Sequence, residues 1–288
     1  MAKLVALTLS GRMTAIDMTP PGRTISGALL RGAGAILVAI TWISAMIFGA
    51  YILAHYGGAV QDGAMDRWNK VLPRLYEPGA VAAMLGIGLH FAAGAVLLLA
   101  GPVQLLSAIR DRAPALHRWT GRIYVTCALV AGLGGLSFIL LKGTIGGMAM
   151  NIGFGLYGSL MAICAAQTLR YALARDLDTH RAWAVRLFAL AIGSWLYRMD
   201  YGFWSLLAND AGHTKDFHGW FDVVMAFFFY VPNLLVAELF IRSRGAQANA
   251  WAKGFAALVL LAAAGFVGLG TYYFTLYAWG PGILARFS

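Results

Sequence analysis

The sequence has few charged residues, since only 12% of its 288 residues are Asp, Glu, Lys or Arg. Soluble globular domains carry about 25%, so this composition excludes an ordinary soluble protein. Hydrophobic residues make up 60% of the chain, and the mean hydropathy is +0.70. Because runs of about 20 apolar residues span a bilayer as helices, the composition predicts an all-α integral membrane protein in contact with the lipid bilayer.

Cysteine is also scarce, with Cys127 and Cys164 as the two examples, both inside apolar runs. The sequence contains no CxxC or CxxCH motif, which excludes a disulfide framework and covalently attached c-type haem. The hydrolase motifs GxSxG and HExxH and the phosphate-binding P-loop motif are missing as well. We therefore predict no metal site of the protease type, and no catalytic residue is assigned.

Acidic residues are few relative to basic ones, 12 against 22, which gives a net charge of +10. The basic residues lie in short loops between the apolar runs. This distribution is typical of membrane topology signals and of contact with anionic phospholipids at the cytoplasmic face. The sequence contains no nucleic-acid-binding module, so we expect no nucleic-acid partner.

The apolar runs predict a single domain of seven transmembrane helices over residues 32–280. A cytoplasmic tail, 1–31, precedes it, and a short periplasmic tail, 281–288, follows it. The loops richest in Lys and Arg place the N-terminus in the cytoplasm and the C-terminus outside, and Asp178 is the expected N-cap of the fifth span. The predicted spans are 32–55, 80–107, 114–141, 149–172, 178–207, 220–241 and 254–279.

Polar residues inside these spans are rare and are therefore candidates for function. At a rise of 1.5 Å per residue, His90 and Arg198 are expected at similar depth in the outer half of the membrane. They form either an interhelical network that fixes packing or the wall of a ligand site. The predicted intramembrane polar network consists of His90, Arg198, Asp200, Asn233 and Glu238.

Two helix beginnings share a pattern of His-Arg, then Trp, then Arg: one starts at His117 and the other at His180. Both are expected at the cytoplasmic ends of their helices. Unpaired N–H groups at a helix N-terminus, together with guanidinium groups, suit anions such as phospholipid headgroups or cofactor carboxylates. Interfacial anchoring by Arg and Trp is the alternative explanation.

The patterns HRxxGRxY, from His117 to Tyr124, and HRxWxxR, from His180 to Arg186, resemble those of a family of bacterial predicted multi-pass membrane proteins of unknown function. Leu89-His90 and the Pro-Asn…Glu pattern on the sixth predicted span also fit that family. The resemblance implies the bacterial inner membrane. A weaker likeness, to di-haem b-type membrane cytochromes, implies one haem between His117 and His180 and another at His90, although the span 149–172 has no His.

These observations favour a redox-linked protein that binds haem b or quinone through its helix-borne histidines. Two alternatives stay open: a non-catalytic accessory or assembly subunit of a membrane complex, and a transporter for an anion or small molecule. The candidate cofactor-binding residues are His90, His117, His180, Arg118, Arg181 and Arg198.

Overall fold

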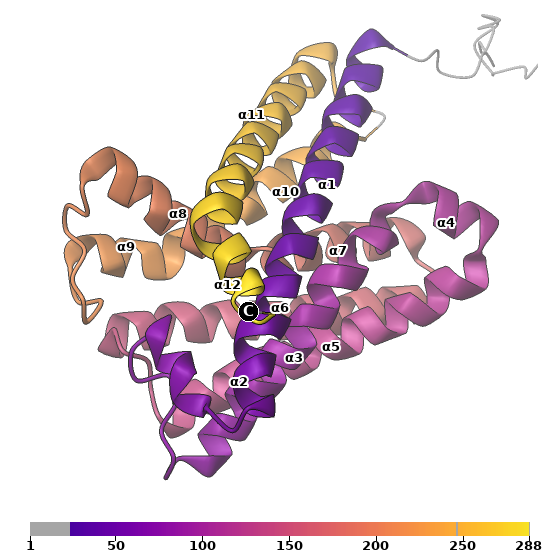
Figure 1. Cartoon of the computed structure of the whole chain (residues 1–288). Helices are drawn as coiled ribbons and strands as arrows, with labels where there is room; N and C mark the ends of the chain where they lie inside the picture. The colour runs from indigo at the N-terminus through magenta and orange to yellow at the C-terminus, as the bar shows by residue number, and fades with distance from the viewer. Residues whose placement is uncertain (1–23, 246, 288) are drawn as a thin grey trace, which may run out of the picture.

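The computed structural model describes residues 24–245 and 247–287, and all the regular structure in these ranges is helical (Figure 1). This architecture confirms the predicted all-α, multi-pass class. The described helical stretches that are long and apolar enough to cross a membrane number six: Ile25–Gln61, Val81–Leu105, Pro114–Leu141, Gly147–Leu173, Trp220–Ser243 and Ala250–Leu284.

The first of these stretches begins earlier than predicted. Helix α1 (Ile25–Ile52) starts seven residues before the expected residue 32, because the Thr24 side chain accepts a hydrogen bond from the Gly27 N–H and caps the helix. It continues through a π-helical turn (Leu53–Gly57) into α2 (Gly58–Gln61). Residues 1–23 of the predicted cytoplasmic tail lie outside the described residues.

Helix α1 packs parallel to the last long helix, α11 (Ala250–Phe274), which continues through a second π-helical turn into α12 (Gly280–Leu284). Near the start of both helices, Leu30 packs in one apolar cluster with Leu260. At their far ends, Arg286 donates hydrogen bonds to Asp62 at 3.0 Å and to Gln61 at 2.7 Å. Both helices therefore begin at the same end of the molecule, as Figure 1 shows.

Three helices pack antiparallel in a row: α3 (Val81–Leu105), α5 (Pro114–Leu141) and α6 (Gly147–Leu173). Glycines allow the helix backbones to approach closely, as is common in membranes. A Cβ atom added at Gly134 of α5 would lie 2.5 Å from the Gly86 carbonyl oxygen of α3. A Cβ atom added at Gly132 would lie 3.0 Å from the Gly158 carbonyl oxygen of α6.

The stretches predicted as the fifth and sixth spans are each divided. The fifth is α7 (Leu177–Ala191) and α8 (Gly193–Ala208), separated at Ile192, and Figure 1 shows α8 projecting from the bundle. The sixth is α9 (Trp220–Phe228) and α10 (Val231–Ser243). Pro232 lies in the first turn of α10, where it cannot donate a backbone hydrogen bond, so the chain breaks just before it.

The structure corrects two boundary predictions. The N-cap of α7 is Asp176 rather than Asp178, because the Asp176 carboxylate accepts from the Thr179 N–H at 3.2 Å. The last stretch extends to Leu284, five residues past the predicted end at residue 279. A 3₁₀ turn (Met65–Lys70) and α4 (Ser107–Arg112) complete the described helices.

Candidate ligand-binding site

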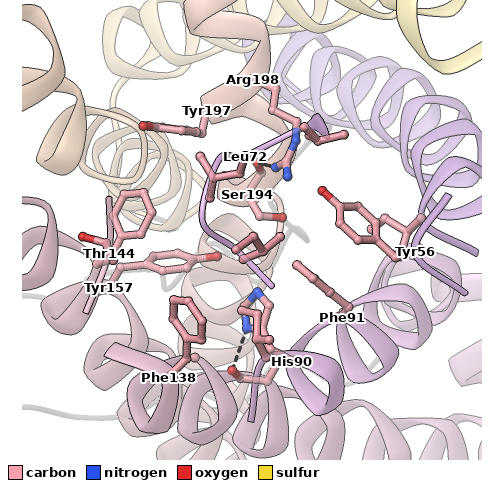
Figure 2. A pocket seen from close by; sticks show the side chains of 18 of the residues that line it. Tyr56, Leu72, His90, Phe91, Phe138, Thr144, Tyr157, Ser194, Tyr197 and Arg198 are labelled. Carbon is pink, nitrogen blue, oxygen red and sulfur yellow. Dashed lines mark hydrogen bonds between the residues drawn. The ribbon is translucent and has the colours of Figure 1, made fainter. Parts of the chain in front are cut away.

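A cavity of about 480 Å³ lies among α1, α3, α5, α6 and α8 (Figure 2). Its walls are mostly aromatic and aliphatic side chains, among them Phe48, Phe91, Phe138 and Trp279. The volume is within the range of about 300–1,000 Å³ that is typical of small-molecule and cofactor sites. The cavity is therefore large enough for an amphipathic ligand.

His90 on α3 is held in a fixed orientation in the cavity wall. Its Nδ1 atom lies 2.8 Å from the carbonyl oxygen of Ala131 on α5. A carbonyl oxygen only accepts, so Nδ1 donates, and the neutral ring keeps a free lone pair on Nε2. Figure 2 shows this second nitrogen directed toward the cavity. His90 thus offers a preoriented imidazole acceptor.

Glycines on α5 make room for the His90 ring. A Cβ atom added at Gly135 would lie 3.2 Å from His90 Nδ1, and one added at Gly134 would lie 3.2 Å from the His90 backbone nitrogen. The close approach of α3 and α5 therefore sets both the position of His90 and its hydrogen bond to Ala131.

Arg198 on α8 lies across the cavity from His90, as Figure 2 shows. Its Nη1 donates to the Ser194 carbonyl oxygen at 2.8 Å, and its guanidinium carbon lies 5.3 Å from the ring centre of Phe48. No described carboxylate lies within ion-pair distance of Arg198. A cation without an acidic partner in a cavity with mostly apolar walls is costly and points to a ligand that carries negative charge.

Residues 71–75 cover one side of the cavity and form what we call the strap. Lys142 fixes the strap, because its Nζ donates to the Arg74 carbonyl oxygen at 3.0 Å and pairs with Glu77 at 2.8 Å. This hydrogen bond from Lys142 holds the pKa of the Glu77 carboxyl below its usual range. The cationic lining residues are Arg74, Lys142 and Arg198, and no acidic side chain is among the described residues that line the cavity.

His117 and His180 lie at the other end of the bundle and do not line this cavity. His180 Nδ1 donates to the Thr168 carbonyl oxygen at 2.9 Å. The Nδ1 atom of His117 is buried without a hydrogen-bond partner among the described residues. Both histidines therefore belong to a different region of the bundle from His90.

The repeated pattern at these two helix beginnings has a structural counterpart. The Arg122 guanidinium carbon lies 5.0 Å from the Trp119 ring centre, and that of Arg186 lies 4.8 Å from the Trp183 ring centre. Each motif therefore places an Arg over the Trp three residues before it, a cation–π contact on one helix face. The arginines next to the histidines contribute to neither stack: Arg118 is exposed, and Arg181 pairs with Asp178 at 3.4 Å.

The other polar residues predicted to form one network lie apart from the cavity. Glu238 on α10 forms an ion pair with Arg186 on α7. Asn233 donates to the Phe229 carbonyl oxygen at 2.9 Å, next to the break between α9 and α10. Asp200 forms no ion pair with any described residue. Of the five predicted members, the structure brings only His90 and Arg198 to a common cavity.

A second polar group, which sequence reasoning did not assemble, touches the same cavity. Tyr197 and Tyr201 line it, and the Tyr201 hydroxyl donates to Asp222 at 2.7 Å. Asp222 also accepts from His213 Nδ1 at 2.6 Å. A lone carboxylate at the start of the apolar run 220–228 is the sequence signal for this group, but its partners come from another helix and a loop.

A comparison with known protein families matches the part of the chain that contains these candidate residues. A family model described as a predicted membrane protein (DUF2306) matches residues 87–241, which include His90, His117, His180 and Arg198. No curated protein and no solved structure matches the chain. The matched segment extends from α3 to α10 and leaves the parallel pair α1 and α11 outside it.

Proposed function

The chain belongs to the DUF2306 family of predicted membrane proteins, and we propose that it is a redox-linked membrane protein that binds haem b in the cavity between His90 and Arg198. The observation that carries this proposal is the free Nε2 of a preoriented imidazole opposite a guanidinium that has no acidic partner among the described residues, in a cavity with mostly apolar walls.

The residues of the cavity fit this cofactor. A metal-ligating histidine commonly donates its other ring N–H to a carbonyl, as His90 does to Ala131. The two carboxylates of haem require cations. Arg198 and Arg74 line the cavity without an ion pair to any described carboxylate, and Lys142, which also lines it, pairs with Glu77. The aromatic walls suit an apolar macrocycle. Haem would supply one-electron chemistry when bound.

The protein's own residues would bind the cofactor, orient it and shield it from water. Ala131 fixes the tautomer and the ring plane of His90. The Phe48 ring and the Ser194 carbonyl hold the Arg198 guanidinium in place. The strap, attached through Lys142, covers one side of the cavity and limits the access of water.

A quinone in the same cavity is the second candidate. Its carbonyl oxygen would accept from the Arg198 guanidinium, and the hydroxyl of its reduced form would donate to His90 Nε2. The acceptor and the donor on facing walls favour this ligand. Arg198 and Arg74, two lining cations without an ion pair to any described carboxylate, favour haem, because a quinone carries no fixed negative charge.

We also propose seven membrane crossings, with the N-terminus inside a bacterial inner membrane. The parallel packing of α1 and α11 supports this count, because an odd number of crossings must separate them. Four membrane-length stretches lie between them, so α7 and α8 together would supply the fifth crossing. Reporter domains fused to the two termini test it: opposite sides are expected, and both termini on one side would contradict the proposal.

On this orientation, Arg118 and Arg181 lie at the cytoplasmic rim beside His117 and His180. Arg118, which is exposed and does not stack on a Trp, is available to anionic phospholipid headgroups, whereas Arg181 would exchange its pair with the exposed Asp178 for such a headgroup. We assign this rim to lipid contact and the cavity to the cofactor.

The absorption spectrum of the full-length protein, purified in mild detergent from haem-replete cells, tests the proposal. We expect a Soret band in the wild type and its loss in His90→Ala. Arg198→Gln should retain less haem, because the propionates lose a cation. His218→Ala, which changes an exposed loop histidine paired with Asp216, is the matched control and should keep the wild-type spectrum.

Two outcomes count against haem. A wild-type protein that elutes as a single folded species with no Soret band would overturn the proposal. If the same preparation yields stoichiometric quinone on solvent extraction, and His90→Ala does not, the quinone candidate replaces it.

A further inference from the structure

A continuous series of side-chain hydrogen bonds leads from the cavity to a loop at the end of α8. The Tyr197 hydroxyl donates to the Tyr201 hydroxyl at 3.2 Å, and Tyr201 donates to Asp222 Oδ1 at 2.7 Å. His213 Nδ1 lies 2.6 Å from the same carboxylate oxygen. Every link is within hydrogen-bond distance, so the four side chains form one connected path.

Burial differs sharply along this path. Asp222 is only 1% exposed, whereas the His213 side chain keeps 24% of its surface exposed. At the other end, Tyr197 and Tyr201 line the cavity, and Figure 2 shows Tyr197 on the same side of it as Arg198. The path therefore connects a solvent-accessible imidazole to the cavity through a buried carboxylate.

The two carboxylate oxygens of Asp222 have different partners. Oδ2 accepts from the backbone N–H groups of Thr214 and Gly219, both at 3.0 Å, and thereby holds the loop and the start of α9. Oδ1 accepts from Tyr201 and His213. Oδ2 therefore bonds only groups that fix the backbone of the loop, whereas Oδ1 bonds two titratable side chains.

We propose that His213, Asp222, Tyr201 and Tyr197 conduct protons between this face of the protein and the cavity. A proton binds Nε2 of His213, and the Nδ1 proton passes to Oδ1 of Asp222. The Tyr201 and Tyr197 hydroxyl hydrogens, which point toward Asp222 in the structure, then rotate, so that Tyr201 donates to Tyr197 and Tyr197 donates into the cavity. In one concerted shift Asp222 gives its proton to the Tyr201 oxygen, Tyr201 gives its own proton to Tyr197, and Tyr197 gives its proton to an acceptor in the cavity. One proton enters, one leaves and no electron moves.

Among the described residues, no other titratable side chain of the loop is hydrogen-bonded to this path. The nearest charged side chains on α8 are Arg198 and Asp200. The other titratable side chains of the loop are Asp210, Lys215, Asp216 and His218, and none of them is hydrogen-bonded to the path in the described structure. A supply of protons beside His90 and Arg198 suits a redox ligand, but the path does not depend on the identity of that ligand.

A pH-sensitive reporter in the cavity tests the path without haem. Both native cysteines are replaced by Ala, and Ser194, which lines the cavity, is replaced by Cys and labelled with a nitrophenol thiol reagent. Absorbance after an acid pulse in stopped flow gives the rate at which protons reach the cavity of the full-length chain in nanodiscs.

The variants separate conduction from folding. Tyr201→Phe removes one carrier but leaves Oδ2 of Asp222 to hold the loop. His213→Asn keeps an N–H donor near the position of Nδ1 but cannot carry a proton. Tyr157→Phe is the matched control, because Tyr157 lines the cavity but donates to the Leu190 carbonyl oxygen instead.

We expect both path variants to slow protonation of the reporter by about 100-fold, the order of effect of a positioned proton carrier. Tyr157→Phe should keep the parent rate, and thiol labelling of the Cys at 194 should be equally fast in all proteins. The inference is overturned if the path variants protonate the reporter as fast as Tyr157→Phe does. It is also overturned if their labelling slows in parallel, because the change would then lie in the cavity itself.

Discussion

The contact between Gly134 and Gly86 allows the effect of a single methyl group to be worked out. In Gly134→Ala the new Cβ would lie 2.5 Å from the Gly86 carbonyl oxygen, which belongs to the rigid backbone of α3. Carbon–oxygen contacts need about 3.3 Å or more, so α3 and α5 must separate by roughly 0.8 Å. Overpacking of this kind costs about 1–3 kcal/mol of the free energy of unfolding.

The same separation reaches His90. Its Nδ1 lies 2.8 Å from the Ala131 carbonyl oxygen, less than one helical turn from Gly134. Lengthening that distance to about 3.6 Å abolishes the hydrogen bond. Gly134→Ala should therefore lower both the stability of the protein and its retention of a ligand at His90.

The assay is unfolding by SDS in mixed micelles, with Gly155→Ala as the control. A Cβ atom at Gly155 of α6 meets no atom within 4 Å. Because Ala is the better helix former, this control should be as stable as the wild type or more stable by about 0.5–1 kcal/mol. If Gly134→Ala unfolds at the same SDS fraction as Gly155→Ala, the close packing of α3 on α5 described here is refuted.

Two further predictions concern ion pairs. Lys142 lowers the pKa of Glu77, so their pairing is fully present above the ordinary Glu pKa of about 4.3 and is lost as the pH falls through the lower pKa of the folded state. Loss of the pair should release the strap and accelerate thiol labelling of Leu72→Cys. Lys142→Met should produce the same acceleration at neutral pH. Arg186→Gln should lower the free energy of unfolding by roughly 1–3 kcal/mol in the SDS assay, because the Arg186 and Glu238 side chains are only 24% and 31% exposed and their pair is intermediate between surface and buried ion pairs. An additional Glu238→Gln should recover most of this stability. An unchanged stability in Arg186→Gln would show that the pair contributes nothing.

Hydropathy averaged over about 20 residues predicted the helical class well, because membrane helices need long apolar runs. Pro114 was expected to begin a helix ending near residue 141, and α5 has these bounds. The break at Ile192 was not predicted, since the hydropathy of 178–207 continues across it, whereas the break in 220–241 falls at Pro232, a residue that marks such an irregularity in the sequence. A short irregularity of the backbone leaves no mark in an average taken over many residues.

The candidate site, like the fold, was predicted from the sequence only in part. The position of each residue along its predicted helix placed His90 and Arg198 at similar depth, and in the structure they line one cavity. Depth carries no information about which way a helix faces, so Asp200, two residues after Arg198, was grouped with them although it does not line the cavity. The strap and the partners of Asp222 depend on loops that fold back onto the helices, and no local pattern predicts such contacts.

The haem content per chain of the purified wild type and of His90→Ala tests the central claim most directly. The free Nε2 of His90 and the cations around the cavity predict that the wild type holds one more equivalent of haem b per chain than His90→Ala does. Equal haem content in the two proteins, or a wild type that contains none, would contradict the assignment of this cavity to haem.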